Sequence, residues 1–266
     1  MKSYNYRFNE ASIVALSTDA LYVSHQSVRL EIRLNMADLR EALLFTAKIA
    51  EGAERFDDML TFMESIVDLG NDLTDEERGL LSLACSEKTM SPIRSWRIIK
   101  AILSFESEES HATLANNYLN ELADEIRNLT SQTISMICNK LLPNATTAEN
   151  KAFYYKMAAD YNRYRAEIEK PNSQERKEVG EKCLAGYAMA SEAAKNLPAY
   201  DPVRLGINLN LSVLYSDILD DEKRACEIGR EALRSSSAEL ENANEVHYSL
   251  ALPIMSILRE NLVKWE

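Results

Sequence analysis

Glycine and proline are scarce in this 266-residue chain, which contains seven and six of them. Because turns and helix breaks depend largely on these two residue types, their scarcity favours long helices over many short strands. No apolar run approaches the roughly 18–20 residues of a membrane-spanning helix. Residues 1–20 hold only a short apolar stretch and make a poor secretory signal. We therefore expect an all-α protein without membrane insertion.

Cysteine and histidine are also scarce, and neither type is spaced like a set of metal ligands. Their positions are Cys85, Cys138, Cys183, Cys226, His25, His111 and His247. The absence of a CxxC pair argues against a zinc site or a disulfide framework, and buried cytosolic thiols are the expectation. The chain also lacks a Gly-rich phosphate loop and a GxSxG motif. We expect no cofactor, no metal and no catalytic activity.

Basic residues are too few to balance the acidic ones. Lys and Arg number 30 against 42 Asp and Glu, which gives a net charge of −12. Such a chain repels nucleic acid and anionic membranes unless it holds a concentrated basic patch. We therefore expect no nucleic-acid partner.

Amphipathic helical periodicity runs from residue 36 onward, whereas residues 1–35 lack a clean period. We expect 1–35 to be a partly ordered N-terminal extension and 36–266 to form a single all-helical domain of about nine helices. Thr74 followed by Glu77 predicts a capping box, and Asp201 before Pro202 predicts another helix start. Pro143 is expected to end the longest helical pattern.

Pro92 interrupts a helical pattern at CSEKTMSPIRSW, residues 85–96. Proline lacks the backbone donor and clashes with the carbonyl four residues earlier. With Ser91 as N-cap and Pro92 at the first helical position, a new helical segment is predicted to start after a kink.

Lys156, Asp160, Arg163 and Tyr164 share one broad face of the helix predicted over 151–167. Asp160 is expected to hold Arg163 in position. Lys156, Arg163 and Tyr164 then offer a point charge, a forked donor and a phenol, which together suit an oxyanion such as phosphate. The alternative is a solvated face with ordinary intrahelical ion pairs.

Asparagine is a poor mid-helix residue, yet Asn208, Asn210 and Asn261 stand in apolar helical stretches. Such an amide either satisfies a neighbour or binds the backbone of an extended peptide. The surrounding apolar residues with helical spacing, for which core packing is the default, are Leu209, Val213, Ile254 and Ile257.

Several long blocks resemble the 14-3-3 family over roughly residues 38–265. They are AKIAEGAERFDDM (47–59), KAFYYKMAADYNRYRAE (151–167), DPVRLGINLNLSVLYSDIL (201–219), EERGLLSLA, LLPNATTAENKAF and IMSILRENLVKW. The resemblance implies nine antiparallel helices in a cupped, usually dimeric protomer, a TPR-like helical array. It implies a non-catalytic adaptor that binds phosphoserine or phosphothreonine segments of other proteins in an amphipathic groove. A eukaryotic source and a cytoplasmic location, with the nucleus as a further possibility, follow from it.

The same resemblance assigns roles to single residues. Arg163, Tyr164 and Lys156 match the family's phosphate ligands, and Asn210 and Asn261 match its two peptide-backbone asparagines. Leu209, Val213, Ile254 and Ile257 match the apolar groove wall, and Asp217 stands in place of a Glu. Pro253 and Lys264 depart from apolar family positions.

The helix around Pro92 departs further, because Ser86 and Ile93 stand where the family has a Lys and an Arg for the phosphate. Arg94 is basic but one residue out of register. Either the break at Pro92 returns Arg94 to the phosphate, or only Arg163, Tyr164 and Lys156 remain. The alternative function is a divergent fold that has lost the phosphate clamp and binds unphosphorylated peptides or serves as a structural interaction protein.

The resemblance also implies a homodimer or a heterodimer with another 14-3-3-type chain. The apolar interface positions match Ile49, Ala53, Ser95, Ile99, Ile102 and Tyr118. Arg55 is expected to pair with Glu125 across the two-fold axis, whereas Asp58 would meet Glu121 where the family has a Lys. These like charges are expected to weaken the dimer.

Overall fold

The computed structural model describes residues 36–265, and the predicted extension at 1–35 lies outside this range. The described residues contain nine helices of 13 residues or more and no β-strand, which confirms the all-α prediction. These helices are α1 Met36–Gly52, α2 Phe56–Asp68, α3 Asp75–Leu103, α4 Glu109–Met136, α6 Ala148–Ile168, α7 Gln174–Ala193, α8 Pro202–Asp217, α9 Glu222–Glu239 and α10 Glu245–Trp265. Three short elements complete the set: the π-helix η2 Ile137–Leu141, α5 Leu142–Asn144 and the 3-10 helix η3 Leu240–Asn242.

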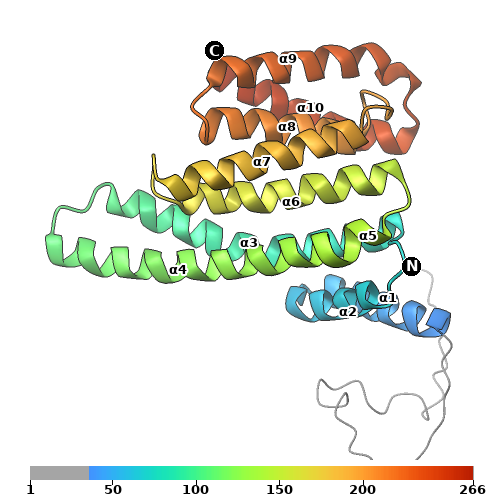
Figure 1. Cartoon of the computed structure of the whole chain (residues 1–266), viewed down its shortest axis with the longest axis horizontal. Helices are drawn as coiled ribbons and strands as arrows, with labels where there is room; N and C mark the ends of the chain where they lie inside the picture. Colours follow the sequence, from blue (N-terminus) through green and yellow to red (C-terminus); the bar gives the residue numbers. More distant parts are fainter. Residues whose placement is uncertain (1–35, 266) are drawn as a thin grey trace, which may run out of the picture. The chain divides into compact units, whose positions relative to one another are not determined.

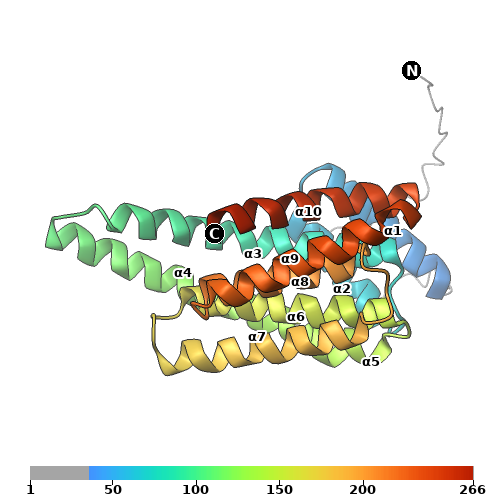
Figure 2. The same ribbon diagram turned by 90° about the horizontal axis from the view of Figure 1, so that it is seen from above.

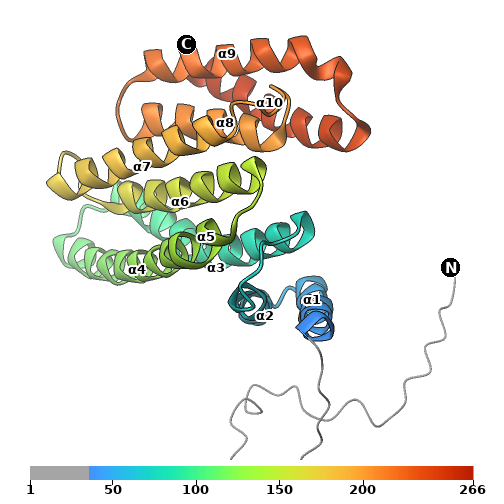
Figure 3. The same ribbon diagram turned by 45° about the vertical axis from the view of Figure 1, so that its right-hand side comes forward.

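Successive helices pack as hairpins, which stack in chain order from α1–α2 to the last three helices (Figure 1, Figure 3). The pairs are α1 with α2, α3 with α4, α6 with α7 and α8 with α9, while α10 packs on both α8 and α9. The α3–α4 hairpin extends beyond the end of its neighbour α6–α7 (Figure 1, Figure 2). Within residues 36–265, every helix is too short or too polar to span a lipid bilayer.

Two helix starts follow the local signals in the sequence. The Thr74 hydroxyl accepts a hydrogen bond from the Glu77 amide at 3.3 Å, and the Glu77 carboxylate accepts one from the Thr74 amide at 2.8 Å, so the capping box is confirmed. Asp201 caps α8, with Pro202 in its first turn. Both starts were predictable because the cap and its partner lie within a few residues.

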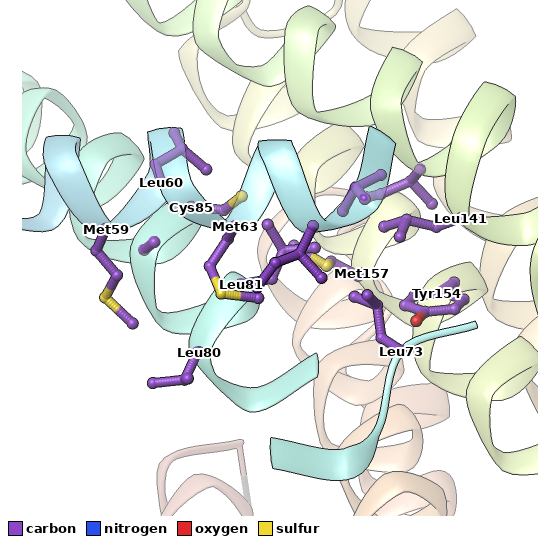
Figure 4. Close-up of a cluster of buried hydrophobic side chains, with 14 of the residues drawn as sticks. Met59, Leu60, Met63, Leu73, Leu80, Leu81, Cys85, Leu141, Tyr154 and Met157 are labelled. Atoms are coloured by element: carbon purple, nitrogen blue, oxygen red, sulfur yellow. The ribbon is translucent and has the colours of Figure 1, made fainter. Parts of the chain in front are cut away.

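Buried apolar side chains join one hairpin to the next. In the cluster shown in Figure 4, Met63 of α2 and Leu81 of α3 lie near Tyr154 and Met157 of α6. A second cluster joins α6, α7 and α8, and another joins α8, α9 and α10. These shared cores fix the positions of α6, α8 and α10 relative to one another.

The predicted break at Pro92 is absent, because α3 is one α-helix from Asp75 to Leu103. Cys85, Thr89, Ile93 and Trp96 are all buried and recur at helical spacing on both sides of the proline. A continuous buried stripe of this kind stabilises an unbroken helix. Its burial outweighs the roughly 3 kcal/mol that an interior proline costs. The hypothesis of a new segment starting after Ser91 is therefore wrong.

The helical run that begins with α4 ends within one residue of the predicted stop at Pro143. α4 passes into the π-helix η2 and then into α5, which contains Pro143 in its first turn and ends at Asn144. A first-turn amide needs no helical partner, so proline is tolerated there. By contrast, α10 continues across Pro253 to Trp265.

Candidate ligand-binding site

The carboxylate of Asp160 on α6 is a hub of hydrogen bonds and is only 8% exposed. Its Oδ2 accepts from Lys156 Nζ at 2.7 Å. Its Oδ1 accepts from the Tyr187 hydroxyl of α7 at 2.6 Å and from Asn210 Nδ2 of α8 at 2.7 Å. A buried charge is stable only when it is paired in this way. Asp160 therefore ties three helices together and orients both Lys156 and Asn210.

Lys156 lies against the backbone of α8 at Gly206. A Cβ added to Gly206 would come within 3.0 Å of Lys156 Cε, closer than nearly all real contacts. Glycine at this position thus allows α8 to approach the lysine side chain. Lys156 on α6 and Asn210 on α8 are about fifty residues apart in sequence, and both contact the carboxylate of Asp160.

Arg163 and Tyr164 are adjacent, and the guanidinium carbon lies 4.8 Å from the centre of the tyrosine ring. Burial lowers the pKa of the Arg163 guanidinium. Tyr187, Tyr164 and Asp160 nearby raise this pKa by more than burial lowers it, so the group stays charged. Its Nε is buried without a hydrogen-bond partner. The expected direct pairing of Asp160 with Arg163 is not found among the described residues, because the Asp160 oxygens bond to other groups.

Arg97 of α3 is a basic residue near the site that the sequence analysis missed. It forms two hydrogen bonds of 2.6 Å to the carboxylate of Glu167 on α6, which raise its pKa. Arg97 is also close enough for its charge to act on Arg163 and Tyr164. It lies four residues after Ile93, one helical turn along the same face of α3, and that spacing could have identified it.

Arg94 is not returned to this site, because α3 keeps its register through Pro92. Its side chain is 56% exposed and lies 3.6 Å from the carboxylate of Glu87. Ile93 is 1% exposed and packs in a cluster with Trp96, where the resemblance would place an arginine. The prediction that the break brings Arg94 to the phosphate is therefore wrong, and α3 offers mainly apolar or paired side chains here.

The remaining predicted residues lie on α8 and α10, which pack against each other. Leu209 and Ile254 are half-buried against the core shared by α8, α9 and α10. Val213 is half-buried and Ile257 is exposed. Asn261 is half-buried, and its side chain makes no hydrogen bond within residues 36–265.

Comparison with known proteins gives the family. The family model described as "14-3-3 protein" matches residues 46–266. The chain belongs to the 14-3-3 family. It is 38% identical over 230 residues to the 14-3-3-like protein GF14 iota of Arabidopsis thaliana, which covers 85% of each chain. It is 38% identical to 14-3-3 protein 3 of Entamoeba histolytica, over 86% of this chain and 97% of the relative. It is equally similar, at 38%, to 14-3-3 protein epsilon of Drosophila melanogaster, over 85% and 87%.

In this 14-3-3 chain, the positions predicted for a dimer interface lie on α1, α3 and α4 and on the turn after α1. Ile49, Ile102 and Tyr118 are 54%, 60% and 52% exposed. The others are exposed or half-buried, namely Ala53, Ser95, Ile99 and Glu125. Arg55 forms an ion pair with Asp58 of its own chain. The interface itself stays a prediction.

Proposed function

We propose that this 14-3-3 chain is an adaptor that binds phosphoserine or phosphothreonine segments of partner proteins. Arg163, Tyr164 and Lys156 would contact the phosphate, while Asn210 and Asn261 would contact the peptide backbone. The observation that carries the proposal is Arg163, which stays charged, has no ion-pair partner within residues 36–265 and has an unused buried Nε donor. A guanidinium with free donors beside a phenol suits a phosphate oxyanion.

The asparagines support the peptide part of the proposal. The Asn210 amide nitrogen is held by Asp160, so its orientation is fixed and its carbonyl oxygen remains an acceptor for a peptide N–H. Asn261 has its whole amide available. Val213 follows Asn210 by three residues and is half-buried, and Ile257 precedes Asn261 by four residues and is exposed. Both would contact apolar side chains of the ligand.

The composition of α3 favours a second candidate function. Ser86 and Ile93 supply no charge, and a charge-assisted hydrogen bond contributes about 1.5–3 kcal/mol. A chain without two such bonds binds phosphate more weakly than one that has them. The second candidate is therefore a 14-3-3 fold that binds unphosphorylated peptides or serves as a structural interaction protein.

Fluorescence polarisation with an Arg-x-x-phosphoSer-x-Pro peptide and its unphosphorylated twin separates the two functions. We expect binding that requires the phosphate and that Arg163→Gln weakens at least about tenfold, since the bond is charge-assisted. Arg94→Gln is the matched control, because Arg94 pairs with Glu87, and it should leave the affinity unchanged. Equal binding of both peptides would favour the second candidate.

The proposal includes association with a second 14-3-3-type chain, non-catalytic action and a cytoplasmic location. The exposed apolar side chains of α1, α3 and α4 support the association. Sedimentation velocity of the full chain would measure it directly.

A further inference from the structure

A cleft of about 890 Å³ lies where the α3–α4 hairpin extends past the α6–α7 hairpin. It is lined by the C-terminal half of α3, the N-terminal half of α4, the end of α6, and the start of α7. None of the residues assigned above to the phosphopeptide lines it. The cleft is therefore separate from the candidate peptide site.

Basic residues are concentrated in this cleft although the chain carries a net charge of −12. Five basic residues line it against three acidic ones, Glu169, Glu175 and Glu178. Arg127 and Glu169 neutralise each other through hydrogen bonds of 3.0 and 2.9 Å. The four basic residues that remain, against two acidic ones, are Lys100, Arg165, Lys170 and Lys182.

Arg165 has strong donors that nothing in the described chain satisfies. Its Nε is closed off from solvent and has no hydrogen-bond partner, and the side chain makes no ion pair within residues 36–265. Lys170 and Lys182 likewise have no ion-pair partner in that range. The ammonium of Lys100 lies 4.5 Å from the centre of the Trp96 ring, which holds it at the wall of the cleft.

The start of α7 adds backbone N–H donors and the positive end of a helix dipole, which Glu175 in its first turn compensates in part. This 20-residue helix begins at Gln174 after the N-cap Ser173, which lines the cleft. The amides at a helix N-terminus and the helix dipole attract anions, phosphates in particular. The unsatisfied guanidinium and the helix N-terminus thus converge on the same space from α6 and α7.

We propose that this cleft binds a small polyanion that carries two or more phosphate groups. A single monoanion would leave much of the positive charge uncompensated, whereas linked phosphates can contact Arg165, Lys182 and the start of α7 together. Arg165 is two residues from Arg163 on α6, which turns it about 200° around the helix axis. The two arginines therefore serve different ligands on different faces of one helix.

Isothermal titration of the full chain with inorganic tripolyphosphate tests the proposal. We expect 1:1 binding that Arg165→Gln weakens at least tenfold. Lys170→Gln and Lys182→Gln each weaken it about threefold or more, and both side chains are exposed, so these variants stay folded even if Arg165→Gln does not. Lys177→Gln removes an exposed lysine of α7 that does not line the cleft and should change nothing.

Absence of binding would overturn the proposal, as would binding that Lys170→Gln and Lys182→Gln leave intact. Loss of binding in Arg163→Gln alone would also overturn it, because the polyanion would then occupy the peptide site. Co-sedimentation with vesicles that contain a phosphoinositide distinguishes a lipid headgroup from a free phosphate compound as the source. Either source supports the proposal if Lys182→Gln weakens the interaction about threefold or more.

Discussion

The side-chain amide of Asn210 on α8 donates to the carboxylate of Asp160 on α6 over 2.7 Å. The same oxygen accepts from Tyr187 at 2.6 Å, and the other oxygen accepts from Lys156. One carboxylate thus orients two residues of the candidate site and links α6 to α7 and α8.

This hub should make Asp160 important for stability. We expect Asp160→Asn to lower the free energy of unfolding by about 3 kcal/mol, because all three donors lose a charged acceptor and the amide that replaces it keeps only one accepting oxygen. Tyr187→Phe removes one of these bonds and should lower it by about half as much. Urea unfolding of both single variants and the double variant measures the coupling. Fully additive effects would contradict a shared hub.

A basic residue restored on α3 should strengthen phosphopeptide binding. Ser86 is half-buried on α3, where the resemblance expects a phosphate-binding lysine. We expect Ser86→Lys to tighten binding of the phosphorylated peptide about tenfold, the effect of one charge-assisted bond. Thr113→Lys adds the same charge at an exposed position of α4 and is the control. An equal gain for the unphosphorylated twin would mean that Ser86 does not face the phosphate.

Pro92 should cost stability without affecting the ligand. An interior proline costs about 3 kcal/mol, and loss of its buried ring offsets about 1 kcal/mol, so Pro92→Ala should stabilise the protein by about 2 kcal/mol. Because α3 is already continuous, phosphopeptide affinity should stay within about twofold. Pro253→Ala is the matched case, since Pro253 is exposed within α10 and has little packing to lose. A large change in affinity for Pro92→Ala would indicate that the proline sets the register.

Helix starts and the neighbourhood of Arg163 and Tyr164 could be predicted because their signals are local. Thr74 and Glu77 cap each other within one turn, and Arg163 and Tyr164 are adjacent in sequence. The spacing on α3 could have pointed to Arg97, but its bond to Glu167 and the bond of Tyr187 to Asp160 could not be predicted, because each joins side chains of two different helices.

The interruption at Pro92 was mispredicted for a related reason. Pro92 was expected to break α3 on its local chemistry, but the buried stripe on either side of it depends on packing with other helices. Local sequence signals therefore predicted the helix caps. Burial of side chains against other helices, by contrast, kept α3 continuous through Pro92.

Glu77 should make stability depend on pH. Its side chain is 2% exposed and accepts two hydrogen bonds of 2.6 Å from Arg40. Burial raises the pKa of Glu77, but bonds from Arg40 and Thr74 lower it more, to a net value below normal. A lowered pKa in the folded state gives stability that is present above the unfolded pKa of about 4.3 and lost as the pH falls through the folded value.

Glu77→Gln should therefore cost about 3 kcal/mol at pH 7, the lower range for breaking a buried pair. The difference from the unmodified protein should shrink as the pH falls below the unfolded pKa of about 4.3 and toward the lowered pKa of the folded state. Thermal unfolding followed by circular dichroism at pH 7, 5 and 3.5 measures this. Glu76→Gln removes an exposed ion pair with Lys48 and is the control. It should lower the free energy of unfolding by less than about 1 kcal/mol at each of the three pH values. A constant difference for Glu77→Gln would contradict the ionic role.

A charge reversal at Glu121 should strengthen the proposed dimer. Asp58 is expected to face Glu121 of the second chain, and Glu121→Lys replaces a repulsion by an exposed ion pair. The two-fold axis repeats this pair, and at about 0.5 kcal/mol each the two pairs contribute about 1 kcal/mol. We expect about a fivefold lower dimer Kd in 50 mM salt and a smaller gain in 500 mM salt, as screening predicts. Sedimentation equilibrium measures both. Glu181→Lys changes the net charge equally on α7 and should have no such effect.

The paired charges around Asp160 have a consequence for how an anion enters the site. Lys156 forms an ion pair with Asp160 and Arg97 forms one with Glu167, so of these three cations only Arg163 has no carboxylate at ion-pair distance within residues 36–265. An incoming phosphate must compete with resident carboxylates, and its capture is an exchange of partners. Few mobile counterions are then released on association. A site of this kind gains selectivity for ligands that outcompete a carboxylate, and its affinity depends only weakly on ionic strength.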